Sequence, residues 1–257
     1  MTNRGIKIAV AGKGGVGKTI FSTLLAHYFS RQNHQVYAID ADPDGSLLFA
    51  LGATEEERSA LVPLIEMKAL IEERMGVGGY YPLNPPVEDL IEKVAISIGK
   101  IKVLQMGGSK RGGESCYCRE NTFLQAMVNS LLWKTSDVVI LDMGAGIEHL
   151  TRGTAKGVDA LVIVVEPTLN SCAMGKTIKQ LAADLEIKSI VYLANKIRGH
   201  QERAFVLEQL QGEQILGTLP YEEKINTLYR VAGKRTDFEF ASDFDYSLQN
   251  IAKLILK

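Results

Sequence analysis

The sequence predicts an α/β fold in which a mostly parallel β-sheet carries helices on both faces. Two observations lead to this prediction. Short runs of β-branched residues alternate along the chain with longer segments whose apolar residues recur at helical spacing, which is the pattern of βαβ units. Several short runs are continuously apolar, as at 161–165, and strands that are buried on both faces of a parallel sheet have this composition.

The expected elements follow one another along the chain. Residues 6–11 form a short apolar run that predicts a buried strand, and a glycine-rich loop follows it. Residues 19–31 carry Leu24, Leu25, Tyr28 and Phe29 at helical spacing. Further strands are expected at 36–40, 102–106, 137–142, 161–166, 189–195 and 214–217, and further helices at 55–75 and 120–133. Residues 76–86 hold three prolines and three glycines, which predict an irregular loop.

The length of 257 residues suits one large α/β domain or two small ones. The chain shows no internal repeat and no low-complexity tract, and the elements on either side of 76–86 resemble parts of one continuous sheet. We therefore expect a single domain over residues 1–257.

Composition limits the partners and the compartment. With 29 Lys and Arg against 30 Asp and Glu, the net charge is −1, so the chain has no global attraction for nucleic acid or an anionic membrane. Three cysteines are too few for a secreted disulfide framework, and no segment resembles a signal peptide or a membrane span. We expect a cytoplasmic protein, with the amphipathic segment 248–257 docked on the core rather than on a membrane.

A phosphate-binding loop is predicted after the first strand. The pattern G-x-x-x-x-G-K-[ST] is matched, between a predicted strand and a predicted helix, by Gly12, Lys13, Gly14, Gly15, Val16, Gly17, Lys18 and Thr19. Glycines let backbone N–H groups surround phosphates, Lys18 would contact the β- and γ-phosphates, and Thr19 would hold Mg²⁺. The letters Gly-Lys-Thr recur at 175–177 without the first glycine or a preceding strand, and we expect ordinary helix there.

Carboxylates end two of the predicted strands. Asp40 and Asp42 belong to the segment 40–44, and Asp142 ends the strand at 137–142, four residues before Gly146. Carboxyl ends of parallel strands border the crevice where ligands bind, although a solvated turn is the alternative for 40–44. Asp142 can hold Mg²⁺ through water, and Gly146 lets the backbone approach a γ-phosphate.

Two cysteines lie in a glycine-rich polar segment. Cys116 and Cys118 are two residues apart, so in an extended segment both sulfurs can bind one metal ion at about 2.3 Å. Lys110, Arg111 and Arg119 flank them and favour thiolates. The alternatives are two incidental cysteines or a strained disulfide. Soft thiolates select Ni(II), Zn(II) or Cu(I), and a two-fold dimer would supply the four that a closed site needs, so a homodimer is predicted. Cys172 is expected to fill apolar space, and His149 is given no role.

The phosphate loop resembles the deviant Walker A motif of nitrogenase-iron-protein and MinD-like ATPases, which have a P-loop NTPase fold. In that family the extra lysine reaches the nucleotide of the partner subunit, which implies this role for Lys13 and implies dimerisation driven by ATP. The D-x-D-P match implies that Asp42 orients or activates the attacking water and that Asp40 supports the Mg²⁺ shell. The resemblance also implies adenine contacts by Asn195 and Pro220, for which ordinary polarity at a strand end is the alternative.

Four segments together, at 12–19, 40–44, 112–121 and 142–153, resemble the CooC/AcsF-type nickel-maturation ATPases. This resemblance implies hydrolysis of ATP to ADP, nickel as the physiological metal with zinc as a substitute, and a client that is carbon monoxide dehydrogenase or acetyl-CoA synthase. It implies delivery of nickel from a Cys₄ site in the homodimer. The alternatives are a MinD/ParA-like positioning ATPase and an iron–sulfur electron-transfer ATPase.

Overall fold

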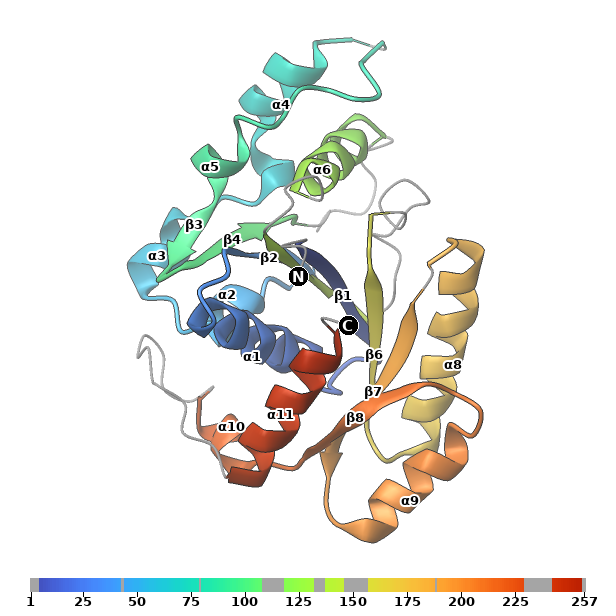
Figure 1. Ribbon diagram of the computed structural model, residues 1–257. Coiled ribbons are helices and arrows are strands. Elements are labelled where there is room, and N and C mark those ends of the chain that lie inside the picture. Colours follow the sequence, from blue (N-terminus) through green and yellow to red (C-terminus); the bar gives the residue numbers. More distant parts are fainter. Residues whose placement is uncertain are drawn as a thin grey trace.

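The computed structural model describes residues 5–42, 44–78, 80–107, 118–131, 137–145, 157–187, 189–228 and 242–255. The described strands form one eight-stranded sheet in the order β3-β4-β2-β5-β1-β6-β7-β8 (Figure 1). All neighbouring pairs are parallel except β3 and β4. The strands are β1 (Ile6–Gly12), β2 (Val36–Ala41), β3 (Ile96–Ile98), β4 (Ile101–Gln105), β5 (Val138–Met143), β6 (Ala160–Val165), β7 (Ile190–Ile197) and β8 (Ile215–Pro220). The predicted α/β fold with a mostly parallel sheet is confirmed.

Helices cover both faces of this sheet (Figure 1). Helices α1 (Lys18–Arg31), α2 (Leu47–Ala50) and α11 (Ser242–Ile255) pack on one face. Helices α4 (Lys68–Met75), α6 (Cys118–Leu131), α8 (Leu169–Asp184) and α9 (His200–Gln209) pack on the other. Successive residues of β1 contribute to opposite layers, since Ile8 lies with α1 and Ala9 with α8 and its neighbours. The remaining short helices are α3 (Glu55–Ala60), η1 (Leu64–Glu66), α5 (Ile91–Val94) and α10 (Glu223–Leu228).

The single helix predicted over 55–75 is wrong. Helix α3 begins with a capping box between Thr54 and Glu57 and ends after six residues, where Leu61 adopts an extended conformation with ψ of 117°. Pro63 follows, and a proline disfavours helical conformation in the residue before it. The segment therefore divides into α3, η1 and α4. The short antiparallel strand β3 was also not predicted.

The C-terminal segment docks on the core as predicted. Helix α11 buries Phe244, Leu248, Ile251, Ala252 and Ile255 against β8 and α1. The fit is close, because a Cβ on Gly217 of β8 would lie 2.7 Å from Cγ1 of Ile251. In the described part of the chain, no helix is both long and apolar enough to span a membrane.

Candidate functional site

The predicted phosphate loop joins the central strand β1 to helix α1. Gly12 ends the strand with φ of 151°, and a Cβ there would lie 2.4 Å from the backbone oxygen of Val164 on β6. Gly17 precedes α1 with φ of 99°, and its Cβ would lie 2.5 Å from Nδ2 of Asn195. Both positions combine a left-handed backbone with a close neighbour, so only glycine fits them without displacement. These motif glycines thus form the turn that leads from β1 into the N-terminus of α1.

Lys18 lies buried at the start of α1. Its Nζ donates to the carbonyl oxygen of Lys13 over 3.4 Å, a long contact that occupies one of the three ammonium donors. Burial lowers the pKa of Lys18, while the charges of Asp142 and Asp42 raise it. The ammonium group therefore lies inside the loop, near two of the predicted carboxylates.

Asp40 and Asp142 are register partners at the carboxyl ends of β2 and β5, and both are buried. Asp40 accepts the backbone N–H groups of Leu47 over 2.9 Å and Asp42 over 3.1 Å. Burial raises the pKa of Asp40 to about 7 and that of Asp142 to about 6. Ser22 donates its hydroxyl to Oδ1 of Asp142 over 3.0 Å, whereas the buried Oδ2 has no hydrogen-bond partner among the described residues. A buried carboxylate oxygen without a donor suits a cation.

Thr19 adds a hydroxyl oxygen to the carboxylate oxygens of Asp40 and Asp142. Its hydroxyl lies 3.3 Å from the hydroxyl of Ser46, which precedes α2. The described oxygens of Thr19, Asp40 and Asp142 are the hard ligands that Mg²⁺ prefers, and the unpartnered Oδ2 is consistent with that ion.

Asp42 lies beyond Asp40 in a turn that the structure describes apart from Pro43. Its Oδ1 accepts the backbone N–H of Asp44 over 3.0 Å, and its carbonyl accepts that of Gly45 over 3.0 Å. Asp44 is exposed and Asp42 is half-buried. The turn that was the alternative interpretation of 40–44 is thus present. Asp40 nevertheless points into the protein, and Asp42 lies at the border of the site.

Strand β7 ends against the phosphate loop. The buried side chain of Asn195 donates from Nδ2 to the carbonyl oxygen of Val16 over 2.8 Å. The next residue, Lys196, donates from Nζ to the carbonyl of Gly15 over 2.6 Å. Pro220 ends the neighbouring strand β8, paired in register with Ile197. Asn195 and Pro220 were predicted to contact the adenine, whereas Lys196 was not predicted, because nothing in an Ala-Asn-Lys sequence shows that both polar side chains reach one loop.

The metal-binding prediction lies largely outside the described residues. This holds for Cys116, and Cys118 is described only as the first backbone position of α6. In the described ranges, no group of three or more His, Cys, Asp or Glu side chains could hold a metal ion. Arg119, next to Cys118, donates to the carbonyl oxygen of Gly76 over 3.2 Å and thereby joins the start of α6 to the end of α4. Gly146 and His149 also lie outside the described residues.

Two smaller predictions are confirmed. Cys172 is 1% exposed, and burial raises the pKa of its thiol, so it packs as an apolar side chain. The repeated Gly-Lys-Thr letters at 175–177 lie within α8, where Lys176 and Thr177 are exposed on ordinary helix.

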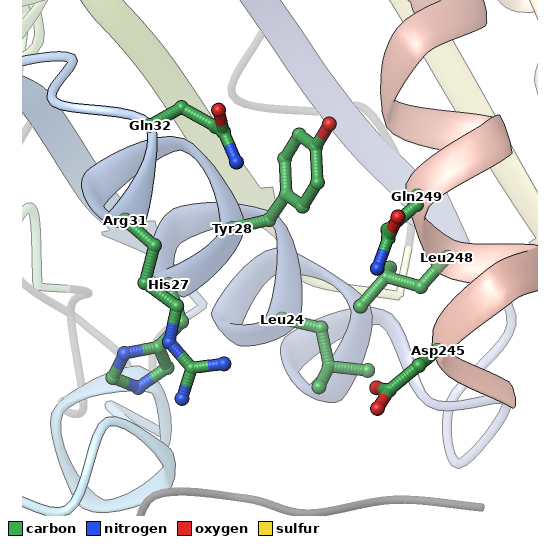
Figure 2. Close-up of a pocket in the computed structure, with 8 residues that line it drawn as sticks. All are labelled: Leu24, His27, Tyr28, Arg31, Gln32, Asp245, Leu248 and Gln249. Atoms are coloured by element: carbon green, nitrogen blue, oxygen red, sulfur yellow. The ribbon is translucent and has the colours of Figure 1, made fainter. Parts of the chain in front are cut away.

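A pocket of about 200 Å³ lies between α1 and α11 (Figure 2). Its lining from α1 begins at Leu24 and ends at Arg31, roughly 9 to 20 Å along the helix from Lys18 at 1.5 Å per residue, and Gln32 follows the helix. Asp245, Leu248 and Gln249 line the opposite side. This pocket is separate from the carboxyl-end site.

Comparison with known proteins decides the family. Residues 7–231 match the CbiA model, described as the CobQ/CobB/MinD/ParA nucleotide binding domain. The chain belongs to this family. The predicted P-loop ATPase is confirmed by this membership and by the relatives described next.

The sequence is 40% identical over 224 residues to the carbon monoxide dehydrogenase accessory protein CooC of Rhodospirillum rubrum, covering 86% of this chain and 85% of that one. It is also 40% identical over 227 residues to an uncharacterised ATP-binding protein of Methanocaldococcus jannaschii, covering 86% and 87%. The fold resembles the MinD cell division protein of Aquifex aeolicus, with a TM-score of 0.66 at 19% identity over 97% of this chain and 95% of that chain. The predicted resemblance to CooC-type and MinD-like proteins is confirmed.

Proposed function

We propose that this chain is a cytoplasmic, ATP-dependent nickel metallochaperone that works as a homodimer and serves carbon monoxide dehydrogenase or acetyl-CoA synthase. The observation that carries the proposal is 40% identity to a carbon monoxide dehydrogenase accessory protein over 86% of the chain. The Cys-x-Cys pair supports it, because two soft ligands at this spacing suit a single thiophilic ion. The proposal treats residues 1–257 as one ATPase domain.

The described residues support an ATP site at the carboxyl end of the sheet. In the proposal, backbone N–H groups of residues 12–19 bind the phosphates, and Lys18 neutralises the β- and γ-phosphates. Thr19, Asp40 and Asp142 would hold Mg²⁺, which supplies charge for the phosphates when it is bound. Asp42, at the border of the site, positions the attacking water.

The adenine is assigned to the ends of β7 and β8. Since Nδ2 of Asn195 already donates to the carbonyl of Val16, we assign Oδ1 of that side chain to the adenine amino group. Pro220, which ends the adjacent strand, would lie against the base. ATP binding at this edge then lets Lys13 reach the nucleotide of the partner subunit.

Dimerisation would complete the nickel site. Cys116 and Cys118 from each of two subunits supply four thiolates to one Ni²⁺ ion, for which Zn²⁺ can substitute. ATP binding brings the subunits together, and hydrolysis to ADP separates them and releases the metal to the client enzyme.

The test combines light scattering with a nickel titration in a non-hydrolysable ATP analogue. The wild type is expected to form a dimer that binds one Ni²⁺. The double variant Cys116→Ser/Cys118→Ser should still dimerise with the analogue but lose the nickel, whereas Cys172→Ala, which changes the buried cysteine, should retain it. Equal nickel per dimer in the wild type and the double variant would overturn the interface site.

Two alternative functions would each give a distinct result in a simple measurement. A MinD/ParA-like positioning ATPase would bind liposomes or DNA in its ATP state. An iron–sulfur ATPase would be brown, with a visible absorption band from the cluster. We expect no liposome binding through helix α11, because its apolar side chains pack on β8 and α1.

A further inference from the structure

Strand β7 is irregular where it meets the phosphate loop. Its pairing with β8 shifts register between Ala194 and Ile197, and Lys196 has φ of 61°, a conformation that residues with a Cβ rarely adopt. In a regular strand, consecutive side chains point to opposite faces. Here Asn195 and Lys196 are consecutive, yet both reach the same loop. The irregularity therefore directs two donors to one target.

These two donors bind consecutive carbonyl groups. Lys196 binds the oxygen of Gly15, and Asn195 binds the oxygen of Val16. In a trans peptide the N–H points opposite to the C=O of the same unit. Fixing the two carbonyls toward β7 thus turns the N–H groups of Val16 and Gly17 away from it, into the loop.

The N–H of Val16 does point into the loop. It donates to the carbonyl of Lys13 across the loop, over a long distance of 3.4 Å. Lys18 donates to the same carbonyl oxygen, also over 3.4 Å. Bonds this long are weak, so a phosphate oxygen inside the loop can replace the carbonyl as their acceptor.

Glu166 holds the lysine in place. Its Oε2 lies 3.1 Å from Nζ of Lys196, and the two side chains are 23% and 39% exposed. The backbone N–H of Glu166 donates to the hydroxyl of Ser171, which is 1% exposed in the first turn of α8. The backbone at Glu166 is therefore anchored to a buried part of the fold, and the carboxylate that extends from it holds Lys196 beside the phosphate loop.

We propose that Lys196 and Glu166 position the phosphate loop for nucleotide: Lys196 holds the Gly15 carbonyl, and Glu166 holds the lysine ammonium. The inference rests on the proposed phosphate-binding role of residues 12–19 and adds two residues outside that motif. Both are positioning residues, since they act on the nucleotide through the loop backbone. The property they set is the affinity for ATP.

The central variant is Lys196→Met, which keeps the long apolar stem and removes the ammonium. The expected result is a rise of about tenfold in the Kd and KM for Mg²⁺-ATP, the size of one charge-assisted hydrogen bond, with kcat changed less than threefold. Lys196→Arg restores a cation and should recover most of the affinity. Lys196→Met/Glu166→Gln should be no weaker than Lys196→Met alone, because both changes break the same connection.

Lys179→Met provides the matched control. It breaks the ion pair of Lys179 with Glu213. Glu213 precedes β8 and so lies near the amino ends of the strands, whereas the phosphate loop lies at their carboxyl ends. Its ATP affinity should equal that of the wild type, and thermal unfolding of all variants checks the fold.

The outcomes separate this inference from the proposed function. If the wild type binds ATP and Lys196→Met binds it equally well, the positioning role is overturned while the ATP site stands. A loss of affinity that Lys179→Met shares, or that Lys196→Arg does not relieve, also overturns it, because the effect is then general to the fold. A wild type that binds no ATP overturns the proposed site and the inference together.

Discussion

Asp40 and Asp142 lie side by side on neighbouring parallel strands, buried at the carboxyl edge of the sheet. Burial raises the pKa of both, to about 7 and about 6. The hydroxyls of Thr19 and Ser22 and then the charge of Lys18 lower the pKa of Asp142 part of the way back. Its Oδ2 has no hydrogen-bond partner in the described part of the chain. The fold thus holds two acidic groups together at a cost that a bound cation would relieve.

Stability should depend on pH through this pair. An unfolded chain releases these protons near pH 4, whereas the folded protein retains them to about pH 6 and 7. Between about pH 4 and pH 7 the folded state binds more protons, so the free energy of unfolding falls as pH rises, by at most about 1.4 kcal/mol per pH unit for each group. Urea denaturation in EDTA across this range measures the slope.

Asp142→Asn should make that slope shallower, and the exposed Asp44→Asn should leave it unchanged. Identical slopes in the wild type and Asp142→Asn would show that Asp142 does not titrate in this window.

Substitution of Gly12 should damage the fold itself. Gly12→Ala places a Cβ 2.4 Å from a backbone oxygen at a positive φ, and we expect a loss of roughly 2–4 kcal/mol in the free energy of unfolding. Gly14 is the control, because a Cβ there meets no atom within 4 Å. Gly14→Ala should lie within about 0.5 kcal/mol of the wild type. Thermal or urea denaturation decides, and equal losses at the two positions would contradict the clash.

Asp42 should affect the chemical step more than binding. Because its carboxylate stands at the border of the site, Asp42→Asn is expected to lower kcat for ATP hydrolysis by about 10²- to 10⁴-fold with little change in KM. Asp44→Asn keeps the backbone N–H that Asp42 accepts and should hydrolyse ATP at the wild-type rate. Phosphate release assays measure both. A normal kcat in Asp42→Asn would assign the water to another group.

Helix α11 should contribute to stability and not to membrane binding. Ile251→Ala removes a buried side chain that packs on Gly217 and should cost about 2–5 kcal/mol. Leu254, 47% exposed on the same helix, is the control, and Leu254→Ala should cost less than about 0.5 kcal/mol. Urea denaturation gives both values. Liposome binding by the wild type with ATP would show that α11 leaves the core.

The sequence predicted features that are encoded locally. Apolar runs revealed the long strands, and the motif at 12–19 placed the phosphate loop between a strand and a helix because Gly12 and Gly17 allow the chain to turn there. Because the carboxyl ends of parallel strands meet at one edge of the sheet, Asp40 and Asp142 could be placed at the same edge. Their raised pKa values depend on burial between two helical layers, which no local pattern shows.

Features that depend on distant contacts were missed. Strand β3 has three residues, too few to show a periodicity of their own, and among the described strands it pairs with β4 alone. The left-handed conformation of Lys196 arises where β7 and β8 lose register. The contact of Asn195 with Val16 joins residues 179 positions apart. The broken segment at 55–75 is different, since its cause is local: Pro63 lies inside it, and a proline disfavours helical conformation in the residue before it.

The position of β1 has a consequence for synthesis. This strand is made early, yet it lies between β5 and β6, and its loop is fixed by residues at the end of β7. A nascent chain that has emerged only to residue 187 contains every residue of the motif at 12–19 but neither of the side chains that hold Gly15 and Val16. We expect nucleotide competence to appear late in translation, when β7 joins the sheet, and ribosome-bound chains of increasing length would reveal the point at which ATP begins to bind.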